Sequence, residues 1–494
     1  MIYMLKMRGL AACVKASGAS VIAIVLAGCV VGPDYERPAV ITPAKWAGDH
    51  GKSSAVKKPD LTAWWRQFND PLLDRLVVQA VDDNLDVATA KAKIREARAT
   101  FRQQTGALLP TADGSGSATR NRSVADAEPS VYNQYKAGFD ASWEVDLFGG
   151  RKRAAEAAGF AAEAANDDLA DTLVTLIGDV TSYYVEARQY QELAALAERT
   201  ARSQRQTAAL TRDQLQAGTA TGADSATADG QAASTEADIP SYRISYLQSV
   251  NRLAVLLGKS PADLQGLMEK RGKIPSPKMV AGLGIPADVL THRPDVRAAE
   301  RRLAQYTAKI GQAEADRYPS ISLTGNIAST ANNLADLGRK STISWSFGPS
   351  VSIPMFHGGQ LKAAVEIAQA QRDQYYVAYQ SAVLSAIEDV ENAIVGLTQS
   401  QQRRAKLAVS VAAYRKAAQI SQELNVAGAT NRLDVLEAER ALYTAESNLI
   451  QSQASIASYY ISLHKALGGG WTGTINVERP AVLDSVVGPR LAMR

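Results

Sequence analysis

The sequence is poor in the residues that build catalytic and metal sites. Its 494 residues include two cysteines and four histidines. The histidines lie far apart and lack metal-ligand spacing; they are His50, His292, His357 and His464. No Gly-x-Ser-x-Gly elbow is present, and Gly258-Lys259-Ser260 lacks both the first glycine and the preceding strand of a phosphate-binding loop. We therefore predict that the chain is not an enzyme and that it holds no metal and no cofactor except a covalent lipid.

That lipid is predicted from the first 29 residues. Three basic residues precede a short apolar stretch over 19–27, which ends in Leu26-Ala27-Gly28-Cys29. This pattern is typical of a secretory signal, with residues 1–28 as the signal peptide, and the cleavage site resembles a bacterial lipobox. Cys29 is then the lipidation site, and Val30 after it indicates an outer-membrane address. The alternative is a plain signal peptide with an incidental cysteine.

Processing at Cys29 has two consequences for the mature chain. Cys13 leaves with the signal and Cys29 carries lipid, so no disulfide can form. Lys6, Arg8 and Lys15 also leave, and because no acidic residue leaves with them the net charge of +4 falls to +1. A balance so close to neutral, without a basic stripe, predicts no nucleic-acid partner.

Long apolar runs are also missing. Beyond the signal, no segment reaches the roughly 20 apolar residues that a transmembrane helix needs. If the mature chain enters a bilayer, we expect it to do so with strands.

Proline is absent from two very long segments. Residues 151–215 contain none and are rich in Ala, Leu, Glu, Gln and Arg, which predicts a single helix about 100 Å long. Apolar residues within it follow the four-three spacing of helices packed as a coiled coil, as in Leu169, Leu173, Leu176, Val180 and Tyr183. Residues 360–424 repeat both features.

Other landmarks recur at an offset of about 209 positions, which indicates a tandem duplication. We expect an extended, lipidated segment over 29–71, a first repeat over 72–285, a second repeat over 286–470 and a tail over 471–494. Each repeat is predicted to contain a helix, a β-hairpin, a long helix and a return helix. Their ranges are 72–107, 111–147, 151–215 and 224–258 in the first repeat, and 286–317, 320–354, 360–424 and 432–467 in the second.

The predicted hairpins alternate apolar and polar residues. In 135–147 the odd positions are apolar and the even positions are mostly polar, and 341–353 and 320–328 behave alike. Strands of about ten residues with this pattern are typical of outer-membrane barrels, although a half-buried soluble sheet shows the same alternation. Four strands cannot close a barrel, whereas three copies supply twelve.

Four motifs carry a family resemblance that spans nearly the whole chain. They are Cys-Val-Val-Gly-Pro-Asp-Tyr-Glu-Arg-Pro at 29–38, Trp-Glu-Val-Asp-Leu-Phe-Gly at 143–149, Arg-Pro-Asp-Val-Arg-Ala-Ala-Glu at 293–300 and Ala-Leu-Gly-Gly-Gly-Trp at 466–471. In this order they resemble the outer-membrane efflux channels, TolC- and OprM-like, in their NodT-type lipoprotein branch. The resemblance implies a mostly α fold with a small β portion, a trimeric 12-stranded outer-membrane β-barrel that continues into a long periplasmic α-helical barrel.

The resemblance also implies a function and partners. The chain is expected to be a passive exit duct for small molecules or drugs, a homotrimer in outer-membrane lipid that works with a periplasmic adaptor (membrane fusion protein) and an inner-membrane efflux transporter. A conduit for secreted proteins stays open as an alternative, and so does a non-conducting lipoprotein that spans the periplasm.

The two turns between long and return helices are the predicted periplasmic tip. Gly218 and Gly428 can each end a helix in a left-handed conformation, and Thr221 and Arg432 lie in the turns where adaptor contact is expected. By resemblance, Asp434 and Glu437 form the acidic gate, with Asp224 as a further candidate whose alternative role is to cap its helix.

The latch that closes the tip in TolC-like members is not evident here. Asn425 and Thr430 stand where those members have a tyrosine and an arginine. Arg432 is the nearest basic residue that could pair with Asp224.

Overall fold

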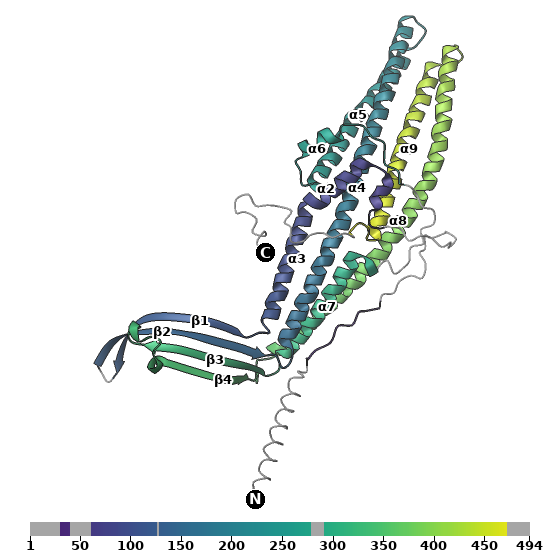
Figure 1. Cartoon of the computed structure of the whole chain (residues 1–494). Helices are drawn as coiled ribbons and strands as arrows, with labels where there is room; N and C mark the ends of the chain where they lie inside the picture. Colours follow the sequence, from purple (N-terminus) through teal and green to yellow (C-terminus); the bar gives the residue numbers. More distant parts are fainter. Residues whose placement is uncertain (1–29, 40–60, 126–127, 278–290, 472–494) are drawn as a thin grey trace. The chain divides into compact units, whose positions relative to one another are not determined.

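The protein is mostly helical with a small antiparallel sheet in its described part (Figure 1). The computed structural model describes residues 30–39, 61–125, 128–277 and 291–471. The predicted signal peptide, Cys29 and the predicted tail beyond Trp471 lie outside these ranges. The main elements are α2 (Pro71–Asp83), α3 (Leu85–Gly106), β1 (Thr111–Ala125), β2 (Glu128–Val145), α4 (Gly150–Gln216), α5 (Gly222–Leu256), α6 (Pro261–Met268), α7 (Pro294–Ala315), β3 (Ser320–Ala331), β4 (Ile343–Ser352), α8 (Gln360–Val426) and α9 (Arg432–Ala466).

The described residues form two compact units. The first contains 30–39, 94–125, 128–165 and 298–380, and the second contains 61–93, 166–277, 291–297 and 381–471. Helices α3, α4, α7 and α8 contribute residues to both.

The sheet belongs to the first unit. Its order is β1-β2-β3-β4, so the two predicted hairpins join into one sheet through β2 and β3. The register places Phe139 opposite Ile327 and Ile327 opposite Trp345, and it places Asp140 opposite Asn326 and Asn326 opposite Ser346. One face of the sheet is therefore apolar and the other polar, because successive residues of a strand point to opposite faces.

The extended segment after Cys29 docks on the helices of the same unit. The Val31 amide donates to the Phe148 carbonyl at 3.0 Å. The Arg153 guanidinium donates to Asp34 at 2.7 Å, and the Tyr35 hydroxyl donates to Glu300 at 2.5 Å. Glu300 is 1% exposed, so the carboxylate that binds the segment is itself buried within this unit.

The core of the second unit joins elements far apart in the sequence. Trp64 is buried and stacks on His464 of α9 with the ring centroids 5.1 Å apart. The Tyr184 hydroxyl of α4 donates to Asp70 at 2.6 Å, while Arg188 donates to the Lys270 carbonyl at 2.8 Å. The other large buried side chains are Leu73, Leu76, Ile177, Leu193, Leu196, Leu253, Leu257, Leu264 and Met268.

The single helix predicted over 72–107 is wrong in one respect, since it breaks at Asn84. Asn84 takes an extended conformation, and its side-chain oxygen accepts from the amides of Asp86 and Val87 at 2.8 and 3.0 Å. Its amide nitrogen donates to the Leu256 carbonyl at 2.9 Å. Asn84 thus caps α3 and satisfies the end of α5, which an uninterrupted helix could not do.

The structure also contains a short helix that the sequence reading did not include, α6, which begins with Pro261 and packs on α5. The helix predicted over 286–317 begins at Pro294, while 278–290 lie outside the described residues.

Candidate functional site

The first tip turn joins α4 to α5 and is built on Gly218. Gly218 has φ +75°, and the Thr219 amide donates to the Gln214 carbonyl at 2.8 Å. A side chain at Gly218 would be strained in this left-handed conformation. The turn therefore ends α4 in the way its glycine predicts.

Asp224 is bound to its own turn. Its carboxylate accepts from the backbone amide of Thr221 at 2.9 Å and from the Thr221 hydroxyl at 2.7 Å. In return, the Asp224 amide donates to the Thr221 hydroxyl oxygen at 3.2 Å. The backbone hydrogen bond from Thr221, followed by that from its hydroxyl, holds the pKa of Asp224 below its ordinary value. This reciprocal capping favours a structural role for Asp224 over a role in the gate.

The second tip turn joins α8 to α9 and repeats the geometry of the first. Gly428 has φ +74°, and the Ala429 amide donates to the Leu424 carbonyl at 2.8 Å. Asp434 accepts from the Asn431 amide at 3.2 Å, so it also contributes to a cap.

The second turn differs from the first by an added polar cluster. Arg432 donates to the Asn425 side-chain oxygen at 2.7 Å, and the Asn425 amide donates to the Thr430 carbonyl at 2.9 Å. The structure thus brings together the two residues at the latch positions and the nearby arginine. Within the chain, Arg432 pairs with Asn425 of its own turn and not with Asp224.

Asp434 and Glu437 lie in the first turn and a half of α9. Both are exposed, and their spacing of three places them on one side of the helix. Within the described residues, Glu437 makes no hydrogen bond or ion pair. Glu437 is therefore available to a lumen or to a partner, whereas Asp434, like Asp224, accepts a hydrogen bond from a backbone amide of its own turn.

Contacts behind the tip hold α9 against α4 and α5. The Ser203 hydroxyl donates to Glu439 at 2.9 Å, and the Tyr443 hydroxyl donates to Asp238 at 2.8 Å. Leu436 packs with Ala208 and Ala228 in a small buried cluster. Burial raises the pKa of Glu439. We call Ser203, Asp238, Glu439 and Tyr443 the α9 seam; sequence reasoning missed it because it depends on which helices become neighbours.

The duplication is visible in one repeated ion pair. Arg205 on α4 pairs with Glu236 on α5, and Arg415 on α8 pairs with Glu446 on α9 at 2.5 Å. Both members of the second pair lie 210 positions after those of the first (415 − 205 and 446 − 236). The helical pairs of the two repeats are therefore built in the same register.

The apolar face of the sheet has no cover within the described part of the chain. Trp345 is 77% exposed, Phe139 69% and Phe347 68%. Single exposed apolar residues are common on soluble proteins, but a continuous patch of large ones marks a surface that another apolar phase covers.

The other face carries hydroxyls, amides and carboxylates. Asp140 accepts a hydrogen bond from the Asn326 side chain, and the same face carries Asp113, Ser142, Glu144, Ser322, Thr324, Ser346 and Ser350. The sheet thus presents opposite chemistry on its two sides.

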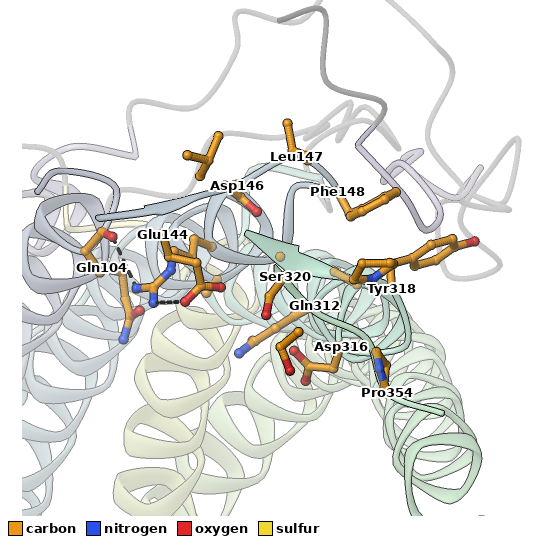
Figure 2. Close-up of a pocket in the computed structure, with 18 residues that line it drawn as sticks. Gln104, Glu144, Asp146, Leu147, Phe148, Gln312, Asp316, Tyr318, Ser320 and Pro354 are labelled. Atoms are coloured by element: carbon orange, nitrogen blue, oxygen red, sulfur yellow. Dashed lines mark hydrogen bonds and ion pairs between the residues drawn. The ribbon is translucent and has the colours of Figure 1, made fainter. Parts of the chain in front are cut away.

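A cavity of about 500 Å³ lies where the strands meet the helices of the first unit (Figure 2). Arg151 donates to Glu144 at 2.5 Å and to the Ala107 carbonyl at 3.2 Å, so it ties β2 to the end of α3. Phe148 stacks on Tyr318 with the ring centroids 4.6 Å apart. These contacts connect the sheet to the helices of this unit around the cavity.

None of the described helices is apolar enough over a sufficient length to cross a membrane. In the same residues no group of three or more His, Cys, Asp or Glu side chains is placed to hold a metal ion.

His464, the histidine stacked on Trp64, has its pKa lowered to about 4 by burial.

Comparison with known proteins identifies the family. The model of the outer membrane efflux protein family matches residues 76–259 and again residues 285–469. The chain belongs to this family. The two matches fall on the two repeats, so the predicted internal duplication is confirmed.

The relatives of this outer membrane efflux protein cover nearly its whole length. It is 35% identical over 453 residues to nodulation protein T of Rhizobium leguminosarum bv. trifolii, which covers 91% of this chain and 96% of that protein. It is 31% identical over 469 residues to the toluene efflux pump outer membrane protein TtgI of Pseudomonas putida, covering 92% and 98%.

A solved structure agrees in fold. The outer-membrane channel OprN superimposes with a TM-score of 0.84 at 32% identity, covering 90% of this chain and all of that one. The predicted fold class, mostly helical with a small β portion, is confirmed. The family is one of outer-membrane channels and not of catalysts.

Proposed function

We propose that this efflux protein is the outer-membrane channel subunit of a tripartite export system, and that three copies form one duct. The observation that carries this proposal is the two-faced sheet. Its apolar face suits lipid and its polar face suits a water-filled lumen.

The sheet requires partners to form a closed wall. Unpaired strand edges are not tolerated in hydrocarbon, and the smallest outer-membrane barrels have eight strands. The four strands of one chain fall short of eight. Three chains related by rotation supply twelve, and each chain's β4 would then pair with the β1 of the next.

The helices support the same ring. Leu384 and Val409 of α8 are 67% and 69% exposed in the chain, and on α5 Ile244 and Val255 are 58% and 52% exposed. We propose that these apolar side chains are covered where one copy meets the next, so that the helices continue the lumen into the periplasm.

At the tip, the ring would gather the carboxylates of Asp434 and Glu437. Three copies place six carboxylates around one opening, which favours cations over anions. Gly218, Thr221, Gly428 and Arg432 lie in the two turns, where a periplasmic adaptor is proposed to dock and to open the tip. An inner-membrane transporter supplies the energy, since a duct of this kind has no source of its own.

The exported compounds are proposed to be small molecules. TtgI is a component of a toluene efflux pump. We also propose that Cys29 carries lipid. The docking of Val31, Asp34 and Tyr35 on the first unit supports this, because it holds the residues that follow Cys29 beside the end of β2.

Single-channel recording of the purified full-length protein in planar bilayers tests the proposal. We expect discrete conductance steps from a trimeric species, with a cation preference. In a second arm, Trp345→Asp and Phe139→Asp on the lipid face should prevent insertion, whereas Ser346→Asp on the lumen face should leave insertion intact. If the protein stays monomeric and shows no conductance, the channel proposal is wrong and the alternative of a non-conducting lipoprotein remains.

A further inference from the structure

Two arginines stand on the apolar face of the sheet, where charge is not expected. The register places Arg120 opposite Asn133 and Arg122 opposite Val131. On the same face, the preceding pairs toward the helices are Ala118 with Tyr135 and Gly116 with Ala137. Both arginines are exposed, and neither makes a hydrogen bond or ion pair among the described residues.

Their depth follows from strand geometry. On β2 the apolar run of this face extends from Val145 to Tyr135, which is ten positions (145 − 135). At about 3.3 Å per residue and a tilt of about 40°, ten positions span about 25 Å of membrane, the height of the apolar band of such barrels. Arg120 comes one pair beyond this run and Arg122 two pairs beyond it. Both therefore lie just past the hydrocarbon edge.

The end of the sheet on which they lie is also determined. β1 follows α3, and β2 leads into α4, so the helices adjoin one end of this hairpin and the arginines approach the other. Figure 1 shows the four strands side by side, with β1 beginning next to the end of α3. If the helices are periplasmic, as the proposed function has it, the arginines lie at the outer leaflet.

We propose that Arg120 and Arg122 form a binding site for the phosphate groups of outer-leaflet lipid. The inference rests on the proposed function, because it needs this face of the sheet to be in lipid. The chemistry fits, since a guanidinium presents a planar fork of donors that matches phosphate oxygens. Two arginines spaced by two on one strand point the same way, about 6.6 Å apart along it. They can therefore engage one headgroup or two adjacent phosphates.

The aromatic side chain beside them supports a lipid and not a free ion. Tyr135 lies on the same face, one pair nearer the membrane centre than Arg120, at the level where interfacial aromatic residues occur in such barrels. A lipid would place its acyl chains along Tyr135 and Phe139 while its phosphate meets the arginines. Inorganic phosphate would use only the arginines.

The test compares the full-length protein with Arg120→Gln/Arg122→Gln. The probe is diphosphorylated lipid A in mixed micelles, and retained lipid is counted by native mass spectrometry. One basic residue near an anionic surface contributes about a fivefold factor, so the double variant should bind roughly 25-fold more weakly. Lys136→Gln is the matched control. Lys136 is an exposed cation of the same sheet, but it lies on the polar face opposite Ser117, so its loss should change nothing.

Further arms identify the source of the phosphate and separate the two proposals. Lipid A stripped of phosphate should bind the wild type as weakly as diphosphorylated lipid A binds the double variant, and inorganic phosphate should not displace the bound lipid. Equal retention of lipid by wild type and double variant overturns the site, as does displacement by inorganic phosphate. Conductance is recorded on the same samples. A double variant that conducts normally but has lost lipid supports the site, while a wild type that neither conducts nor enters a bilayer counts against the proposed function itself.

Discussion

The two long helices have the same length and different surroundings. α4 and α8 are 67 residues each, and each leads into a return helix of 35 residues. In the second unit, Leu193 and Leu196 of α4 are 1% and 2% exposed, while Leu384 and Val409 of α8 are 67% and 69% exposed. The duplication therefore reproduced the length of the long helix but not the residues that pack around it.

The reason lies in what the chain supplies to each helix. α4 bonds to Asp70, to the Lys270 carbonyl near α6 and to Glu439 on α9, so it has partners in three other parts of the same chain. α8 contacts α9, where Tyr459 lies against Gly396 and Glu446 meets Arg415. The exposed apolar side of α8 is the one that a second copy would cover.

The largest expected effect is on assembly. Leu384→Glu/Val409→Glu should convert the trimer into monomers, because an unpaired carboxylate costs on the order of several kcal/mol to bury and a ring repeats that cost at every interface. Analytical ultracentrifugation in detergent measures the change. The matched variant Leu384→Met/Val409→Ile keeps the side apolar and should remain trimeric. A stable trimer of the glutamate variant would show that this side of α8 faces water.

The second largest effect is expected on ion selectivity, to which the two tip turns should contribute differently. Asp434→Asn/Glu437→Gln should lower the cation-to-anion permeability ratio on the order of tenfold, because six carboxylates are lost from one ring. The Asp224 carboxylate is less exposed than those of Asp434 and Glu437 and accepts two hydrogen bonds from Thr221, so Asp224→Asn should leave selectivity unchanged. Bilayer recordings of reversal potential in a salt gradient distinguish the two. Equal losses from both variants would place Asp224 in the gate as well.

Features set by local chemistry could be predicted from the sequence, and features set by tertiary neighbours could not. Proline-free runs of good helix formers placed α4 within one residue at each end, and the period-two alternation placed the two faces of the sheet. Asn84 was missed because its side chain is satisfied by Leu256, which is 172 residues away. α6 has only eight residues, which is too short for a helical pattern of apolar residues to be recognised in the sequence.

The tip shows the same division. The glycines predicted both turns, because a left-handed residue is a local requirement. The capping and gating roles of Asp224 could not be separated until its hydrogen bonds with Thr221 were seen. Arg432 donates to Asn425 within its own turn, and its suggested pairing with Asp224 is not among the contacts of the described residues.

A smaller effect concerns position 439, where the repeats diverge in chemistry. Asp229, its counterpart 210 positions earlier (439 − 229), pairs with Arg212 at 2.9 Å, whereas Glu439 is partly buried against Ser203. Burial raises the pKa of Glu439 above its ordinary 4.5. Because the pKa is raised in the folded state, the contribution of Glu439 to the stability of the seam is fully present below pH 4.5. This contribution is lost as the pH rises through the folded-state pKa.

Glu439→Gln should therefore remove the pH dependence of the α9 seam while retaining the hydrogen bond from Ser203, worth roughly 1 kcal/mol. Hydrogen exchange of the amides around Leu436, compared between wild type and variant at each pH, measures it. Protection of the wild type should approach that of the variant toward low pH and fall below it toward neutral pH. Asp229→Asn is the control and should leave the amides near Leu436 unaffected. Parallel pH profiles for wild type and Glu439→Gln would contradict the assignment.

The smallest effect is expected where the repeats agree. Arg415 and Glu446 form an exposed pair, with side chains 64% and 22% exposed, and such pairs contribute less than about 1 kcal/mol because water and salt screen them. Arg415→Gln should lower the melting temperature by no more than about two degrees. Arg205→Gln in the first repeat should do no more, since its pair with Glu236 occupies the equivalent place. Differential scanning calorimetry at low and high salt measures both, and high salt should abolish both shifts. A much larger loss at Arg415 alone would mean that this pair is desolvated in the assembled ring, as expected if the neighbouring copy covers α8 as far as this pair.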